Sequence, residues 1–314
     1  MTAASASAPT SFLDRPDGAR LALHVTGVAD PDLVVVLAHG WQAAASVWDR
    51  HARRLHLPAV RIRVIRFDQR GHGASTSGSL TAQIGVLADD LAAIVSAGAP
   101  RGVPVLLAGH SMGAMSVLGL AARHPHLIGA PVTGVLLASA TLGGLDLSGA
   151  DHPLRRRVVA RTRRTMAAAC LRVPGPAQVV RNVVRPRPYT QPSIEVAAAW
   201  FHALMEHDVV GQVGVLARVP VHVLVGELDP LTGPLHALRL VQEIPGARLH
   251  LVAGGGHRLP TRSPAEVEAV LRLASQEAVS HRPTMSLRAG LQGVRLGRWS
   301  DRLLRTQPTS RRRR

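Results

Sequence analysis

The sequence predicts an α/β fold with a mostly parallel central sheet flanked by helices. Short runs rich in Val, Leu and Ile alternate with longer amphipathic runs, as strands and helices do in parallel sheets. One apolar run ends at a serine between glycines, and a helix-prone run follows at once. The alternation stops at about residue 142 and resumes after about residue 217. We therefore expect one α/β domain at residues 11–278 with a helical cap inserted at about residues 142–217.

The elements before the insertion follow from turn residues and hydrophobic periodicity. Pro16-Asp17-Gly18 separates β-prone runs at Ser11–Leu13 and Arg20–Val25, which predicts a hairpin. Leu80–Ala97 is a predicted helix because its apolar residues recur at helical spacing. The other expected elements are strands at Leu33–Ala38, Ile62–Phe67, Val103–Ala108 and Val132–Ala138, a helix at Ser46–Leu57 with Ser46 as N-cap, and a helix at Ala114–Arg123.

After the insertion the alternation resumes and closes the domain. Strands are expected at Val219–Gly226 and Arg248–Val252, and helices at Pro234–Gln242 and Pro264–Ala274. Residues 1–10 lack the charged and apolar regions of a secretory signal. We expect a disordered lead there and a cytoplasmic location. The single cysteine, Cys170, can form no intrachain disulfide.

All 37 basic residues are arginine, and they are concentrated in two segments. Residues 152–188 hold 10 Arg and no acid, whereas the rest of the domain is near neutral. This positive segment could attract anionic substrates or bind a membrane surface. The alternative is that it is simply a solvated face. The basic tail at residues 279–314 places Leu287, Leu291 and Val294 between arginines at near-helical spacing. It predicts either disorder or weak binding to an anionic membrane surface; no nucleic-acid binding is expected.

The serine at the end of the fifth strand has the pattern of a nucleophile elbow. Gly109-His110-Ser111-Met112-Gly113 lies between a strand and a helix, so the serine hydroxyl should be exposed at the end of the sheet. Gly109 and Gly113 fit because side chains at those positions would clash where strand and helix approach each other. The helix N-terminus favours negative charge that develops there. Ser111 is therefore the candidate nucleophile, and His110 is expected to be structural.

A nucleophilic serine needs a base and an acid that orients the base. The base should lie on a flexible loop after the last strand, and His257 follows three glycines there. The acid should follow the preceding strand, where Asp229 is the first candidate and Glu227 the second. Asp146, after an earlier strand, is a distant third. The expected set is Ser111, Asp229 and His257.

An oxyanion hole requires two backbone N–H groups. One should come from Met112, the residue after the nucleophile. The other should come from the loop after the Leu33–Ala38 strand, His39-Gly40-Trp41, in which Gly40 permits close approach. We expect the second donor to be the Trp41 N–H.

These blocks together resemble the α/β-hydrolase superfamily. The chain is similar to its serine esterase and lipase group through His39–Trp41, Asp68–Gly73, Gly109–Gly113, Gly226–Thr232 and Gly255–His257. The resemblance covers roughly Ser11–Ser275 and implies an α/β-hydrolase fold, with Asp68–Gly73 bracing the site. Relatives that dehalogenate alkanes or open epoxides have Asp at the nucleophile position, so Ser111 favours acyl transfer.

The expected reaction is hydrolysis of a carboxylic ester in a small acyl substrate, without metal or cofactor. The same residues would serve thioester, lactone, amide or carbon–carbon cleavage, or a cofactor-free haloperoxidase or perhydrolase reaction. A non-catalytic binding protein is the alternative from another class. His202, Glu206 and His207 loosely resemble a zinc helix, but their spacing does not match one, and we expect a solvated surface there.

Overall fold

The computed structural model describes residues 11–145 and 192–281. An eight-stranded sheet runs through the molecule in the order β1-β2-β4-β3-β5-β6-β7-β8. The strands are β1 (Ser11–Asp14), β2 (Arg20–Gly27), β3 (Leu33–Ala38), β4 (Ile62–Phe67), β5 (Val105–His110), β6 (Val132–Ala138), β7 (Val221–Gly226) and β8 (Arg248–Val252). β1 and β2 pair antiparallel, as does β2 with β4, and every pair from β4 to β8 is parallel. The predicted α/β architecture is confirmed.

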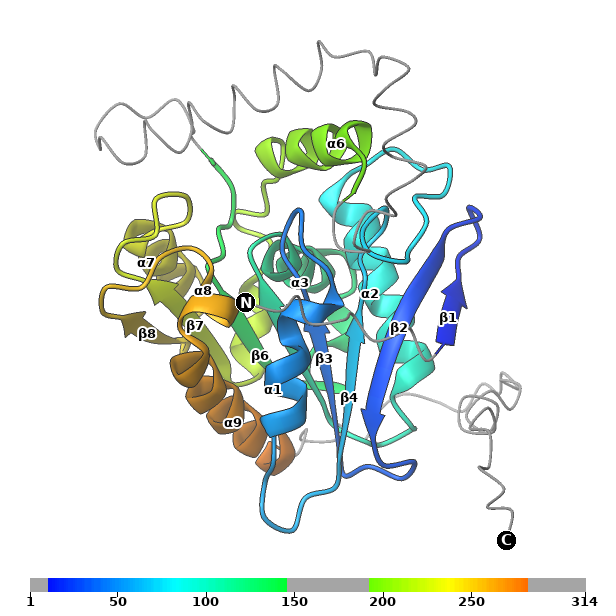
Figure 1. Ribbon diagram of the computed structural model, residues 1–314. Helices are drawn as coiled ribbons and strands as arrows, with labels where there is room; N and C mark the ends of the chain where they lie inside the picture. The colour runs from blue at the N-terminus through cyan, green and yellow to red at the C-terminus, as the bar shows by residue number, and fades with distance from the viewer. Residues whose placement is uncertain (1–10, 146–191, 282–314) are drawn as a thin grey trace, which may run out of the picture.

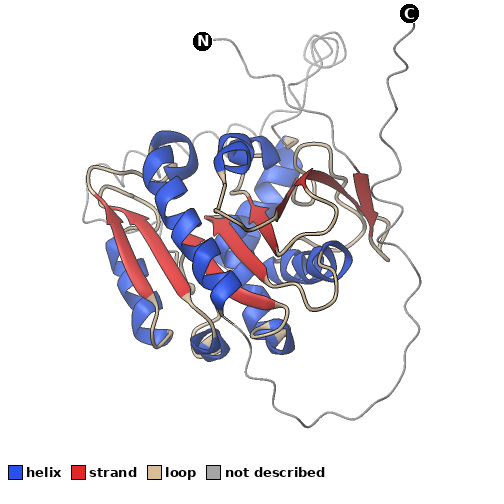
Figure 2. Ribbon diagram, turned by 90° about the horizontal axis from the view of Figure 1, so that it is seen from below, coloured by secondary structure: helices blue, strands red, loops and turns tan. Residues whose placement is uncertain are grey.

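Helices cover both faces of this sheet (Figure 2). The helices are α1 (Asp49–Arg54), α2 (Ile84–Gly98), α3 (Met112–Arg123), α6 (Ile194–Met205), α7 (Pro234–Glu243), α8 (Leu259–Arg262) and α9 (Pro264–Ser280), with 3₁₀ turns η1 (Ala45–Trp48), η2 (Pro125–Leu127) and η3 (Gly214–Arg218). One core lies between the sheet and α2, α3 and α7, and a second lies between the opposite face and α9. Strands β3, β5 and β6 are buried along their whole length, which explains their mostly apolar sequences. β4 is buried over its last four residues and carries Arg63 and Arg66.

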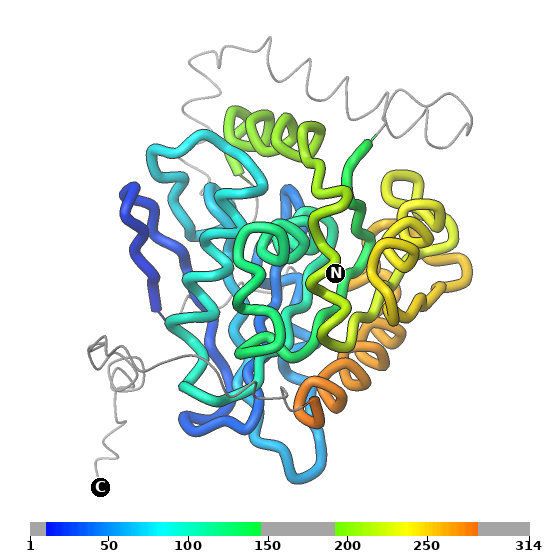
Figure 3. The backbone as a smooth tube through the Cα atoms, turned by 180° about the vertical axis from the view of Figure 1, so that it is seen from behind, coloured from blue at the N-terminus to red at the C-terminus, as the bar shows by residue number. Residues whose placement is uncertain are grey.

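α6 lies above the carboxyl ends of the parallel strands (Figure 1), as the view from behind also shows (Figure 3). Its buried residues share a hydrophobic cluster with Met112 and Met115 of α3. α6 belongs to the segment predicted as a cap. Ser193 caps it by accepting a hydrogen bond from the Val196 N–H. The predicted cap between residues 146 and 191 lies outside the described residues, with Asp146, Cys170 and the cap arginines. The lead at residues 1–10 and the tail from residue 282 also lie outside them.

Several predicted bounds were wrong. β5 begins at Val105 rather than Val103, and β7 begins at Val221 rather than Val219. The helix expected at Ser46–Leu57 is a 3₁₀ turn followed by a short α-helix, and Ser46 is not its N-cap. The Asp68 carboxylate takes that role from a distant loop, because its Oδ1 accepts the Ala45 N–H at 2.7 Å. α2 begins at Ile84 rather than Leu80, and α9 continues to Ser280 rather than ending at Ala274.

Candidate active site

Ser111 lies at a sharp turn between β5 and α3. Its backbone has φ 53° and ψ −120°, a left-handed conformation that costs energy for a residue with a side chain. A Cβ on Gly109 would lie 2.4 Å from the Gly113 carbonyl oxygen, and a Cβ on Gly113 would lie 2.4 Å from that of Ala38. Only glycine fits either position, so the close packing of strand, turn and helix dictates the sequence pattern around the serine.

The structure brings Ser111, His257 and Asp229 together from three loops at the carboxyl edge of the sheet. His257 Nε2 lies 2.9 Å from Ser111 Oγ. His257 Nδ1 lies 2.9 Å from Asp229 Oδ2 and 3.1 Å from Oδ1. This geometry fits an imidazole that donates from Nδ1 to the carboxylate and accepts the serine hydroxyl at Nε2. The chain of hydrogen bonds can remove a proton from the serine.

Asp229 is held as an anion by its own loop. Oδ1 accepts the backbone N–H of Leu231 at 2.9 Å and of Thr232 at 3.0 Å, and Oδ2 accepts the Thr232 hydroxyl at 3.0 Å. Burial raises the pKa of Asp229, but the hydrogen bonds from His257 and from the two backbone amides outweigh burial and hold the pKa below the usual range. Thr232 was not anticipated as a site residue, although a Thr three residues after an Asp is a recognisable turn pattern.

Glu227, the second candidate acid, has another partner. Its Oε2 accepts the backbone N–H of Gly254 at 2.8 Å, and its side chain is exposed. Gly254 begins the glycine run that leads to His257. Glu227 therefore fixes the start of the loop that carries the imidazole and does not contact the imidazole itself.

The carbonyl oxygen of His257 is also held in place. His110 Nε2 donates to it at 2.7 Å, and the Ser139 hydroxyl lies 3.3 Å away. Burial lowers the pKa of His110 to about 3, so its ring is neutral and keeps a proton on Nε2 for this bond. His110 was expected to be structural, and its contacts are with the loops of the site. Ser139 was not anticipated; its φ of 52° is unusual for a non-glycine residue.

The loop that contains Trp41 packs against the serine turn. A Cβ on Gly40 would lie 2.9 Å from His110 Nδ1 and 3.2 Å from Ser111 Cβ, so only glycine allows this approach. Met112 is the first residue of α3. No acceptor within residues 11–145 or 192–281 bonds to the backbone N–H of Trp41 or of Met112.

The Asp68–Gly73 segment forms hydrogen bonds with the loop at residues 39–42. His39 Nε2 accepts the Gln69 N–H at 2.9 Å, and its Nδ1 donates to the Gly40 carbonyl at 2.7 Å. His72 Nε2 accepts the Gln42 N–H at 3.3 Å. Burial lowers the pKa of His39, and lowers that of His72 to about 3, so both rings are neutral acceptors. The sequence singled out this segment only through the resemblance, and the structure gives it a physical role.

The sequence model of the alpha/beta hydrolase family matches residues 35–270. The chain belongs to this family. Among curated proteins, the probable oxidoreductase EphD of Mycobacterium tuberculosis (strain ATCC 25618 / H37Rv) is 33% identical over 108 residues, which are 34% of this chain and 17% of EphD. The bifunctional esterase/perhydrolase DCH of Acinetobacter calcoaceticus is 35% identical over 107 residues, which are 34% of this chain and 36% of that protein. The chain thus matches about a sixth and about a third of the length of these relatives.

The likeness to solved structures extends over most of the chain. A thermophilic esterase from Thermogutta terrifontis is 24% identical, covers 85% of this chain and 97% of its own, and superposes with a TM-score of 0.59. At this level of identity the comparison establishes the shared α/β-hydrolase fold.

The two histidines at the end of α6 and just after it, His202 and His207, do not share one surface. His202 and Glu206 are exposed neighbours whose side chains lie 3.5 Å apart. His207 is 6% exposed, so the expectation of a solvated surface was wrong for this residue. The chain turns inward after α6, and His207 enters the protein interior. Burial lowers its pKa to about 4.

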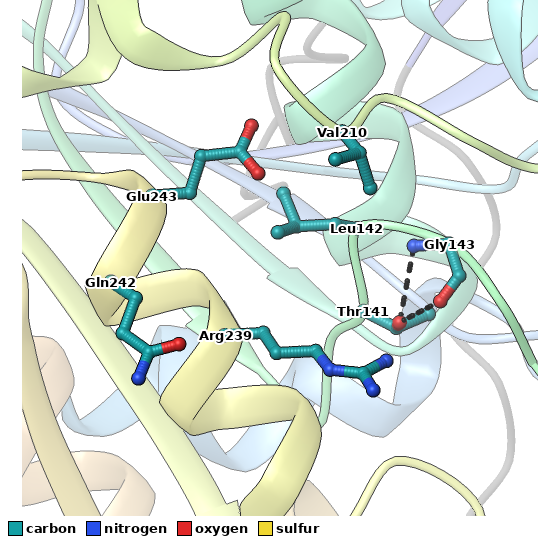
Figure 4. A pocket seen from close by; sticks show the side chains of 7 residues that line it. All are labelled: Thr141, Leu142, Gly143, Val210, Arg239, Gln242 and Glu243. Atoms are coloured by element: carbon teal, nitrogen blue, oxygen red, sulfur yellow. Dashed lines mark hydrogen bonds between the residues drawn. The ribbon is translucent and has the colours of Figure 1, made fainter.

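A separate groove of about 520 Å³ lies between α7 and the segment after β6 (Figure 4). It is lined by Thr141, Leu142, Gly143, Val210, Arg239, Gln242 and Glu243. None of these is a predicted site residue.

Among the described helices, none is both long and apolar enough to cross a bilayer.

Proposed function

We propose that this protein is a serine hydrolase that cleaves carboxylic esters through an acyl-enzyme on Ser111. The observation that carries the proposal is the hydrogen-bonded chain from Ser111 Oγ to His257 Nε2 and from His257 Nδ1 to Asp229. An imidazole aligned in this way can take the serine proton as the hydroxyl attacks, and a carboxylate kept ionised can stabilise the imidazolium that forms.

In the proposed mechanism Ser111 Oγ attacks the ester carbonyl while its proton moves to His257 Nε2. The carbonyl oxygen becomes an oxyanion, which the backbone N–H groups of Trp41 and Met112 stabilise. The protonated His257 then donates the proton to the departing alcohol, which leaves an acyl group on Ser111. Water attacks this ester while its proton moves to His257 Nε2. The bond between the acyl carbon and Ser111 Oγ then breaks, His257 returns the proton to Oγ, and the carboxylic acid is released. Each oxyanion donor typically lowers the barrier by about 3–4 kcal/mol.

Esters are the preferred substrate class for two reasons. The nucleophile is a serine, whose chemistry is acyl transfer. The relatives named esterases also support it. Ser111, Asp229 and His257 would also serve other reactions. These are the cleavage of thioesters, lactones, amides or carbon–carbon bonds, and the formation of peracids. The partly matching esterase/perhydrolase makes perhydrolysis, in which hydrogen peroxide replaces water in the second step, the alternative to measure beside ester hydrolysis.

The proposal is tested by trapping the acyl-enzyme. Protein mixed with 4-nitrophenyl acetate and quenched in acid should carry an acetyl group on the peptide that contains Ser111, as measured by mass spectrometry. An acetyl group on another residue during turnover would overturn the mechanism. A series of esters of increasing chain length, assayed with and without hydrogen peroxide, would then assign the substrate class.

A further inference from the structure

The indole of Trp41 reaches away from its own loop and bonds to α6. Trp41 Nε1 donates to the Ala197 carbonyl oxygen at 2.9 Å, across 156 positions in the sequence. Its ring also packs against Phe201, with ring centroids 5.4 Å apart at an angle of 41°. Ala197 and Phe201 are one helical turn apart, so α6 presents a single face to the indole. Two contacts of different kinds therefore join the loop after β3 to this helix.

α6 also packs beside the second proposed oxyanion donor. Its buried residues Trp200, Ala203 and Leu204 share one hydrophobic cluster with Met112 and Met115 at the start of α3. Trp41 is a partly buried member of the same cluster. The two residues whose backbone N–H groups would hold the oxyanion thus have their side chains in one cluster with one helix.

The loop that contains Trp41 needs this support. Gln42, the next residue, has φ 54°, which is unfavourable for a residue with a side chain and persists only where the surroundings hold it. His39 donates to the Gly40 carbonyl and His72 accepts the Gln42 N–H, so the residues on both sides of Trp41 in the sequence are held. The indole contacts with α6 hold Trp41 itself.

We propose that the Trp41 side chain is a positioning residue through which α6 sets the direction of the Trp41 N–H in the oxyanion hole. The inference rests on the proposed serine hydrolase function. It assigns α6 a part in stabilising the oxyanion, beyond covering the site. The competing role is that the indole only lines the acyl pocket, which would affect the binding of substrate and the preferred chain length.

Two substitutions separate these roles. Trp41→Phe keeps a ring for Phe201 and removes the bond to Ala197, and Phe201→Leu removes the ring contact from the α6 side. Trp48→Phe is the matched control, because Trp48 is fully buried, lies outside the site and has no hydrogen-bond partner for Nε1 in the described part of the chain. Circular dichroism and thermal unfolding show whether each variant is folded.

The readouts are kcat and KM for a 4-nitrophenyl ester and the inhibition constant of phenylboronic acid, which forms a tetrahedral adduct on the serine. We expect Trp41→Phe and Phe201→Leu to lower kcat roughly 10-fold and boronate affinity in parallel, with little change in KM. This lies below the roughly 10²- to 10³-fold loss expected when a whole donor is removed. Trp48→Phe should leave kcat and the boronate affinity unchanged.

The possible failures are distinct. Unchanged kcat and boronate affinity in folded Trp41→Phe and Phe201→Leu would overturn the role of α6, as would a change in KM alone. An equal loss in Trp48→Phe would also overturn it, because the effect would then be one of general stability. Wild-type protein that neither hydrolyses esters nor binds the boronate would overturn the proposed function, and this inference with it.

Discussion

His257 Nδ1 lies 2.9 Å from Asp229 Oδ2, although the two residues are 28 positions apart on separate loops. The Asp229 loop follows β7 and the His257 loop follows β8, and these strands are parallel neighbours. Their carboxyl ends therefore meet at one edge of the sheet. The contact between acid and base is a consequence of strand order, and Leu231 and Thr232 fix the carboxylate that makes it.

Asp229→Asn should lower kcat for a 4-nitrophenyl ester by roughly 10³- to 10⁴-fold, because the amide cannot hold the imidazole in the required tautomer. Glu227→Gln is the matched control, since it neutralises the other candidate acid two residues away. We expect it to change kcat less than about threefold. A larger loss in Glu227→Gln than in Asp229→Asn would reverse the assignment of the acid.

His110→Leu should lower kcat roughly 10-fold, because the His257 carbonyl loses its closest donor and the glycine-rich loop gains freedom. His110→Gln places an amide N–H near the position of Nε2 and should recover much of the activity. Steady-state kinetics of the two variants, with thermal unfolding beside them, tests this role. Equal activity of the Leu and Gln variants would show that the hydrogen bond to His257 has no part in the reaction.

Gly40→Ala should separate the Trp41 loop from the serine turn, because the added Cβ would meet His110 and Ser111. We expect kcat to fall roughly 10- to 100-fold with the fold retained, since displacements of about 1 Å have effects of this size. Gly214→Ala is the control, because a Cβ at Gly214 meets nothing within 4 Å. Wild-type kcat in Gly40→Ala would mean that this loop supplies no donor.

Arg70 forms a buried ion-pair network that the sequence did not predict. Its Nη2 lies 3.0 Å from Asp90 Oδ1 and 3.0 Å from Asp17 Oδ1, and Arg15 Nε lies 2.8 Å from Asp90. Asp90→Ala leaves Arg70 without one of its buried partners and should cost about 3–5 kcal/mol of the free energy of unfolding. Urea unfolding would measure this loss.

The exposed pair of Asp14 and Arg20 provides the comparison for Asp90→Ala. Its atoms lie 2.9 Å apart, but the side chains are 76% and 57% exposed. Asp14→Ala should therefore change stability by less than about 1 kcal/mol. Equal losses in Asp14→Ala and Asp90→Ala would contradict the importance assigned to burial.

Acid should destabilise the protein through its buried histidines. Burial lowers the pKa of His72 and His110 to about 3 and of His207 to about 4, from 6.5. Below pH 6.5 the unfolded chain takes up protons that the folded protein does not, so stability falls as the pH drops from 6.5 toward 4. Each histidine contributes up to about 1.4 kcal/mol per pH unit.

His207→Gln isolates one of these histidines, because the amide does not titrate. The slope of the free energy of unfolding against pH should become shallower by about 1.4 kcal/mol per pH unit between pH 6 and 4.5. Urea unfolding at several pH values gives both slopes. Identical slopes in wild type and His207→Gln would show that folding does not lower the pKa of His207.

The sequence predicted several strands to the residue. Leu33–Ala38 and Val132–Ala138 are buried along their whole length and mostly apolar, which made their bounds recognisable. Ile62–Phe67 also has the predicted bounds, although two arginines interrupt its apolar residues. Helix starts were less accurate, since they depend on groups far away in the sequence. The Asp68 carboxylate caps η1 across 23 positions, and no local pattern around Ser46 could indicate it.

The site was predictable where its chemistry imposes a local pattern. Gly109 and Gly113 are required by the turn at Ser111, and the loops at the carboxyl ends of β7 and β8 contain few alternatives to Asp229 and His257. Ser139 and the indole of Trp41 act through contacts between segments far apart in the sequence. Such contacts leave no periodicity or spacing in the sequence, so only the structure shows them.

Labelling with a fluorescent fluorophosphonate tests the central claim most directly, because this reagent reacts with a serine only where a neighbouring base activates it. The account predicts that wild-type protein is labelled and that Ser111→Ala, folded as judged by circular dichroism, is not. Labelling that persists in Ser111→Ala, or its absence from wild-type protein, would contradict the claim that Ser111 is the activated nucleophile.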